Sequence, residues 1–88
     1  MKYFTAVLKM LDSTKSQELR PRHLEFLGQK EKEGKIFARG RFADGAGGMV
    51  IYRAESIEEA KKIAESDPYV ASGARSLELH EWDMKLFQ

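Results

Sequence analysis

Residues 35–54 read KIFARGRFADGAGGMVIYRA, and this stretch decides the fold. It contains two runs of strand-favouring residues, 35–42 and 48–54, on either side of the pair Asp44-Gly45. Asp-Gly pairs readily adopt the positive φ angles that tight turns between antiparallel strands require. The stretch therefore predicts a β-hairpin in the middle of the chain.

A helical pattern precedes the hairpin. Gly34 is typical of the residue that directly follows a helix. Pro21 has no amide hydrogen and disfavours the helical conformation in Arg20, so we expect the regular helix to span residues 21–33. Its inward stripe is formed by residues that recur at helical spacing: Leu19, His23, Phe26 and Leu27.

The remaining segments complete a βαββαβ order. Ser56 and Glu59 form a capping box, which predicts a second helix that ends before Asp67-Pro68. Residues 2–11 and 75–82 have strand patterns, and the first carries apolar side chains on both faces, so both of its faces are expected to be buried. This order predicts an α+β fold in which two helices cover one face of a four-stranded antiparallel sheet.

One domain over residues 1–88 is expected to work as a homodimer. A chain of 88 residues builds a thin core, and the absence of cysteine removes disulfides as a support. The predicted sheet has one open face, and a second copy that packs on it would bury aromatic side chains such as Tyr3, Phe37 and Trp82. The alternative is that these aromatics are isolated surface residues, as in many proteins.

Composition argues against several kinds of partner and cofactor. The formal charge of +1 offers no electrostatic footprint for nucleic acid or an anionic membrane. The apolar start of the chain is too short for a signal peptide or a membrane span, so a cytoplasmic location is expected. Without cysteine, paired histidines or a phosphate-binding glycine pattern, the sequence predicts no cofactor and no metal.

His23 is the most informative polar residue, because it lies on the inward stripe one turn from both Leu19 and Leu27. One interpretation is a core histidine that is hydrogen-bonded for structural reasons. The other is a general acid or base. If the helix begins at Pro21, His23 lies in its first turn, where the helix dipole favours the neutral imidazole that can accept a proton.

Other candidates also have two interpretations. Asp44 could orient a histidine, or it could simply form the hairpin turn. Asp67-Pro68-Tyr69 could end the second helix, or Tyr69 could offer its hydroxyl to a pocket. Arg39 and Arg41 could attract an anionic substrate or form a solvated strand face.

The motifs together resemble the YciI (YCII-related) family over nearly the whole chain. The residues that carry the resemblance are Arg20-Pro21-Arg22-His23-Leu24, Gly34, Asp44, Asp67-Pro68-Tyr69 and Gly73. The resemblance implies a ferredoxin-like subunit paired into a dimeric α/β barrel, similar to muconolactone isomerases, with a histidine and an aspartate in the active site. It implies His23 as the histidine and favours Asp44 over Asp67 as the aspartate.

Two functional hypotheses follow. The first is a cofactor-independent lyase or isomerase that acts on a small aromatic or lactone-like molecule. Its catalytic residues would be His23 and Asp44, and its substrate-binding residues Arg22, Arg39, Arg41, Asp67 and Tyr69. The second is a non-catalytic or regulatory dimer that holds a small molecule. A His23 ring nitrogen within about 3.2 Å of a carboxylate oxygen, beside a cavity, favours the enzyme.

Overall fold

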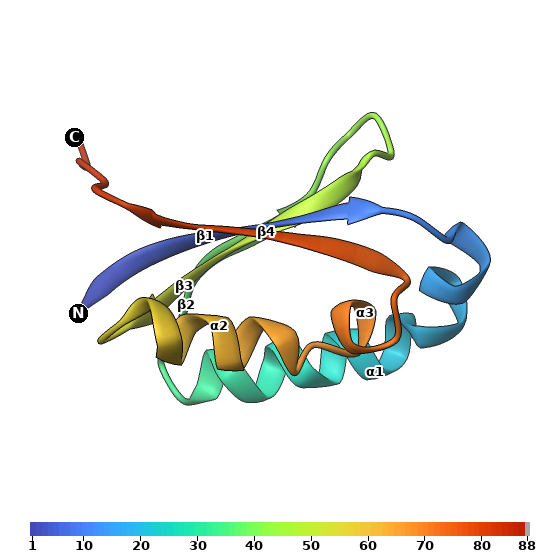
Figure 1. Ribbon diagram of the computed structural model, residues 1–88, viewed down its shortest axis with the longest axis horizontal. Helices are drawn as coiled ribbons and strands as arrows, with labels where there is room; N and C mark the ends of the chain where they lie inside the picture. The colour runs from blue at the N-terminus through green and yellow to red at the C-terminus, as the bar shows by residue number, and fades with distance from the viewer. Residues whose placement is uncertain (88) are drawn as a thin grey trace.

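A computed structural model describes residues 1–87 and shows a sheet with its helices on one side (Figure 1). The elements are β1 (Lys2–Met10), α1 (Ser13–Lys32), β2 (Ile36–Arg41), β3 (Gly47–Ala54), α2 (Ile57–Glu65), α3 (Pro68–Ala71) and β4 (Arg75–Trp82). The four strands are antiparallel in the order β2-β3-β1-β4. The predicted α+β, ferredoxin-like βαββαβ fold is therefore confirmed, with the short helix α3 as an addition.

The core lies between the sheet and the helices. Phe4, Ala6 and Leu8 alternate along β1 and are all buried, because this face of the strand meets the helical layer. Leu27 of α1 and Ala64 of α2 pack in one cluster with Ala6 and Leu8, and Ala60 of α2 packs in a second cluster with Phe4. No helix within residues 1–87 has both the length and the apolar character needed to cross a membrane.

The opposite face of the sheet is only partly covered in a single chain. Tyr3 and Val7 of β1 are half-buried there, and Trp82 of β4 is 41 % exposed. The expectation that both faces of the first strand are buried therefore holds for one face only. Figure 1 shows the physical reason, which is that all three helices lie on the other side of the sheet.

Helix α1 begins eight residues before the predicted start. Asp12 caps it by accepting a hydrogen bond from the Lys15 amide at 2.9 Å, and Pro21 lies inside the helix. A proline within a helix removes one backbone hydrogen bond, and tertiary packing of the helix outweighs that loss in α1. The expected position of His23 in the first turn is therefore wrong, and the dipole argument built on it does not apply.

The C-terminal end of α1 agrees with the sequence pattern. Glu33 is the cap residue, and Gly34 follows with a φ of 75°. The amides of Gly34 and Lys35 bond to the carbonyls of Glu31 and Lys30, which closes a Schellman motif.

A β-bulge in β2 sets which side chains face the helices. The register places Ile36 opposite Tyr52 but Ala38 opposite Ile51, so one extra residue is inserted in β2. After the bulge, Arg39 lies opposite Val50, a buried residue of the helix-facing side. Paired residues share a face, so the bulge directs Arg39, and two residues later Arg41, toward the helical layer.

Candidate active site

The centre of the candidate site is a buried pair formed by His23 and Asp67. The Nδ1 atom of His23 lies 2.8 Å from the Oδ1 atom of Asp67. His23 is 8 % exposed and Asp67 is completely buried. A charge-assisted hydrogen bond in such surroundings is stronger than one in water and holds the imidazole ring in a fixed orientation.

The tripeptide Asp67-Pro68-Tyr69 explains why a carboxylate lies at this position. Asp67 is the N-cap of α3, and its Oδ1 atom also accepts a hydrogen bond from the Tyr69 amide at 2.9 Å. Pro68 occupies the first helical position, where its missing amide hydrogen is not needed. The predicted end of α2 is thus followed by a second, short helix whose cap is also the partner of His23.

The pairing defines which nitrogen of His23 is available for chemistry. An ionised carboxylate only accepts hydrogen bonds, so the Nδ1 atom of His23 carries the hydrogen in this pair. The neutral ring then has its lone pair on Nε2, and no side chain of residues 1–87 is hydrogen-bonded to that atom. A neutral imidazole in this tautomer can accept a proton at Nε2, and Asp67 then stabilises the imidazolium.

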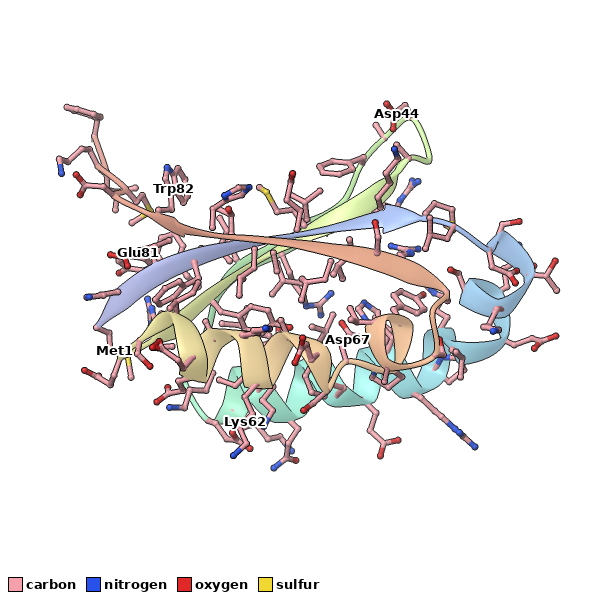
Figure 2. The ribbon with its side chains drawn as sticks, in the orientation of Figure 1. Met1, Asp44, Lys62, Asp67, Glu81 and Trp82 are labelled. Atoms are coloured by element: carbon pink, nitrogen blue, oxygen red, sulfur yellow. The ribbon has the colours of Figure 1, made fainter. Side chains whose placement is uncertain are left out.

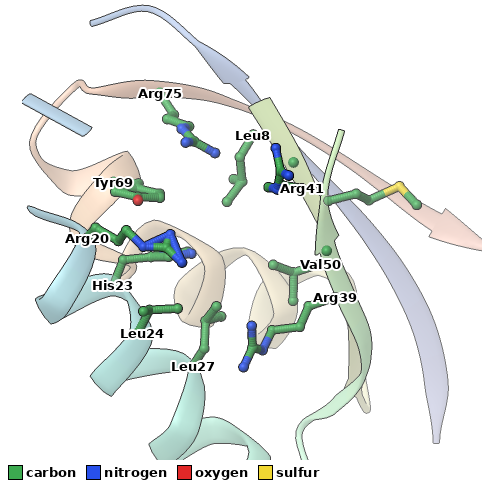
Figure 3. Close-up of a pocket in the computed structure, with 13 residues that line it drawn as sticks. Leu8, Arg20, His23, Leu24, Leu27, Arg39, Arg41, Val50, Tyr69 and Arg75 are labelled. Carbon is green, nitrogen blue, oxygen red and sulfur yellow. The ribbon is translucent and has the colours of Figure 1, made fainter. Parts of the chain in front are cut away.

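Tyr69 and Arg75 continue the site as a stack of side chains. The Tyr69 ring lies 3.8 Å from the His23 ring at an angle of 14°, and the Arg75 guanidinium lies 4.2 Å from the centre of Tyr69. Figure 3 shows Arg75 and His23 on either side of Tyr69. These contacts restrict the His23 ring on one face, while Asp67 restricts it at Nδ1.

A cavity of about 150 Å³ lies beside His23. Its apolar lining comes from the core-facing strands and from α1, and its polar lining is dominated by arginines (Figure 3). The residues that line it are Leu8, Arg20, His23, Leu24, Leu27, Arg39, Gly40, Arg41, Gly48, Met49, Val50, Tyr69 and Arg75. The site therefore combines a hydrogen-bonded histidine with space for a small molecule.

A second cavity of about 300 Å³ adjoins the first near the start of α1. The two cavities share Arg20, Arg41, Tyr69 and Arg75. The outer cavity adds polar residues of α1, including Ser13, Ser16 and Gln17.

The structure brings most of the candidate residues together. Arg39, Arg41 and Tyr69 line the cavity with His23. Asp67 lies behind His23 and does not line the cavity, so its position fits a residue that orients the histidine better than one that contacts a substrate. Within residues 1–87, no cluster of three or more His, Asp or Glu side chains could hold a metal ion.

The expected pairing of His23 with Asp44 is corrected by this geometry. Asp44 lies at the tip of the β2–β3 hairpin, far from Asp67 and on the other side of the sheet (Figure 2). Its carboxylate accepts a hydrogen bond from the Ala46 amide at 2.9 Å, which is the turn chemistry that an Asp-Gly sequence favours. The carboxylate that binds His23 within the chain is Asp67.

Arg22 does not reach the cavity, whereas Arg20 does. Arg22 lines a separate groove on the outside of α1 with Glu25 and Lys30. Residues three apart share a helix face, so Arg20 projects beside His23, and Arg22 does not. The early start of α1 places Arg20 inside the helix, and the sequence pattern did not predict this start. Arg75 was also missed, because an arginine at the first residue of a strand matches no local motif of a binding site.

Tyr52 adds an electrostatic feature near the pair. Its side chain is completely buried, and its hydroxyl has no hydrogen-bond partner in the described chain, as is also true of the Oδ2 atom of Asp67. Burial raises the pKa of Tyr52 well above its usual range, and the negative charge of Asp67 raises it further. Asp67 is thus close to two buried groups, the His23 ring and the Tyr52 phenol.

Comparison with known proteins agrees with this fold. The chain is 37 % identical over 83 residues to the uncharacterised protein YjpA of Bacillus subtilis, covering 94 % of this chain and 98 % of the relative. A solved structure matches with a TM-score of 0.78 and 21 % identity, and the match covers 94 % of this chain and 95 % of the chain in that structure. That structure is 5-chloro-2-hydroxyhydroquinone dehydrochlorinase (TftG) from Burkholderia phenoliruptrix in complex with 2,5-dihydroxybenzoquinone, and at this identity it supports the fold alone. The family model for the YCII-related domain matches residues 1–83, and the chain therefore belongs to the YCII-related family.

Proposed function

We propose that the protein is a cofactor-independent lyase or isomerase that acts on a small aromatic or lactone-like molecule bound in the cavity beside His23. The observation that carries this proposal is the 2.8 Å bond between His23 and Asp67 at the wall of that cavity. A histidine ring that is oriented by a carboxylate and leaves Nε2 free is the arrangement that general acid–base catalysis requires.

The proposed chemistry is proton transfer at carbon. The Nε2 atom of His23 removes a proton from a carbon next to a carbonyl group, and the electron pair of the broken C–H bond moves into the conjugated system. In an isomerase, the imidazolium returns the proton to another carbon of the same molecule. In a lyase, the electron pair expels a leaving group instead, and the imidazolium releases its proton to that group or to water. Asp67 is a positioning residue that stabilises the imidazolium between the two steps.

The size of the cavity and the structural neighbour support a small cyclic substrate. Cavities of about 150 Å³ hold a single six-membered ring. The neighbouring dehydrochlorinase was solved with 2,5-dihydroxybenzoquinone, which is a molecule of this size.

The working unit in this proposal is a homodimer formed through the open face of the sheet. Apolar and aromatic side chains lie on this face, and no helix within residues 1–87 covers them. A second copy that packs its own open face against them would remove this surface from water by two-fold symmetry.

Hydrogen–deuterium exchange tests the proposed chemistry. Hydroxylated quinones and unsaturated lactones are incubated with the protein in D₂O, and the loss of their C–H signals is followed by NMR. We expect exchange that is faster with wild type than without protein. His23→Gln should reduce the protein-dependent rate by about 100-fold or more, which is the usual contribution of a general acid or base.

Lys62→Gln is the control, because the Lys62 side chain is exposed on α2, on the helical side of the sheet, and lies outside both cavities. It should exchange the probes as fast as wild type. A probe that binds in the cavity but exchanges no faster with wild type than with His23→Gln would contradict the enzyme and support the non-catalytic binding module.

A further inference from the structure

We propose that the ligand of this site is a ring-sized organic anion whose carboxylate or ring oxyanion is held by Arg20, Arg41 and Arg75 where the two cavities meet. The proposal rests on the proposed function for the location of the site. It goes further because it assigns the charge of the ligand and the residues that select it.

Three different elements bring these arginines to one end of the sheet. Arg20 lies three residues before His23 on α1 and shares its helix face. Arg41 ends β2 opposite Gly48, on the side that the bulge turns toward the helices. Arg75 begins β4 opposite Met10. Figure 3 shows Arg75 next to Tyr69, Arg20 next to His23, and Arg41 across the space from them on the strand side.

Little negative charge of the described protein faces the arginines in this space, because the buried Asp67 carboxylate lies behind His23 and is already paired with that ring. No aspartate or glutamate lines either cavity. Arg39 is bonded to Glu31 at 2.9 Å, but Arg20, Arg41 and Arg75 form no salt bridge within residues 1–87. Cations gathered around a partly apolar cavity repel one another, and a bound anion removes this repulsion.

The shape of the two cavities indicates how the anion is oriented. The inner cavity has an apolar wall formed by Leu8, Leu27 and Val50, which suits the body of a ring beside His23. The shared arginines lie toward the outer cavity, which suits an oxygen substituent of that ring.

Arginine is suited to this role for two chemical reasons. Its planar guanidinium presents parallel N–H groups that match two oxygens of a carboxylate. It also stays protonated at all relevant pH values, so it binds an anion without giving up a proton. The transfer of protons is thereby left to His23.

Ligand binding to the full chain tests the proposal, with benzoate and 4-nitrophenolate as the anionic probes. Benzamide has the shape of benzoate without its charge, and acetate has the charge without the ring. Dissociation constants are measured by NMR titration of backbone amides. We expect both ring anions, or one of the two, to bind at least about 10-fold more tightly than benzamide and acetate, as expected for charge-assisted hydrogen bonds.

Arg20→Gln and Arg41→Gln should each raise the dissociation constant of the preferred anion by about 10-fold and leave that of benzamide unchanged. Arg22→Gln is the matched control on the same helix and should bind all probes like wild type. If either test variant fails to fold, the wild type still tests the proposal, because added salt should weaken binding of the anion and leave binding of benzamide unchanged.

Three results would overturn the proposal. Benzamide could bind as tightly as the ring anions, no probe could bind at all, or the Arg22 and Arg41 variants could lose the same affinity for the preferred anion. His23→Gln should retain the preference for the anion, because the arginines are unchanged. A protein that prefers anions but shows no His23-dependent exchange would overturn the proposed reaction and leave the ligand class intact.

Discussion

The Oδ1 atom of Asp67 lies 2.8 Å from the Nδ1 atom of His23, although 44 residues separate the two along the chain. The same oxygen accepts the Tyr69 amide at 2.9 Å, so one carboxylate oxygen caps α3 and orients the histidine. The position of the histidine ring is thereby tied to the local fold of Asp67-Pro68-Tyr69.

The first prediction concerns the tautomer of His23. The neutral ring should carry its hydrogen on Nδ1, because Asp67 only accepts there. Long-range ¹H–¹⁵N NMR distinguishes the two ring nitrogens of His23. A hydrogen found on Nε2 of His23 in the neutral ring would show that the pairing does not exist in solution.

The second prediction compares two Asp→Asn substitutions. Asp67→Asn should lower the free energy of unfolding by about 1–3 kcal/mol, because it weakens the charge-assisted bond and buries an amide group where Oδ2 has no partner. Asp44→Asn is the matched control, since Asp44 also accepts a backbone amide at 2.9 Å but is exposed. Its effect should stay within about 0.5 kcal/mol. Equal losses in urea unfolding experiments would contradict the importance of the buried pair.

The third prediction follows from the raised pKa of Tyr52. A pKa above the ordinary value of 10.0 means that the folded protein keeps the phenol proton at a pH where the unfolded chain releases it. The resulting stabilisation is fully present below the unfolded pKa and is lost as the pH rises toward the folded pKa. Wild type should therefore lose more free energy of unfolding than Tyr52→Phe between about pH 8 and about pH 11.

At neutral pH the same substitution should change stability by less than about 1 kcal/mol, because the hydroxyl that it removes has no hydrogen-bond partner in the described residues. Urea unfolding of both proteins at each pH provides the measurement. Parallel alkaline losses in the two proteins would exclude Tyr52 as the group responsible.

Local sequence signals predicted most of the fold. The second helix has its capping residue at Ser56, the first ends just before Gly34, and β4 spans residues 75–82, all as predicted. Each of these signals depends on neighbouring residues along the chain, such as a side chain that accepts an amide three positions later or a glycine that adopts a positive φ.

The parts of the site that were missed depend on tertiary structure. The choice of Asp67 over Asp44 depends on the packing of α3 beside α1, which no local pattern encodes. Arg20 was missed because a helix that began at Pro21 would exclude it. The helix begins earlier, where Asp12 caps it, and Arg20 therefore shares a helix face with His23. The bulge that turns Arg39 and Arg41 toward the helices is a property of the pairing between β2 and β3.

The fourth prediction separates two glycines of the first helical region. Gly28 lies inside α1 with no atom within 4 Å of an added Cβ, so Gly28→Ala should raise the free energy of unfolding by about 0.5–1 kcal/mol. Gly34 also has free space but adopts a φ of 75°, so Gly34→Ala should lower it by about 1–2 kcal/mol. Changes of the same sign in chemical denaturation would contradict a helix that contains Gly28 and ends before Gly34.

The fifth prediction tests the proposed dimer through its apolar face. Val7 lies on the open side of β1, paired with Met49 and Glu78 of the neighbouring strands. A lysine at this position would place a charge between the two sheets, where no water is available to solvate it. Val7→Lys should therefore sediment as a monomer at concentrations at which wild type is a dimer, with an unchanged far-ultraviolet circular dichroism spectrum.

Ile57→Lys is the control of matched chemistry, because Ile57 is 40 % exposed at the start of α2, in the helical layer that lies across the sheet from the open face. This variant should remain a dimer. A wild type that sediments as a monomer, or a Val7→Lys variant that stays dimeric, would show that the open face is not the interface. Since both substitutions add the same charge to the chain, a difference between them must come from the face that carries it.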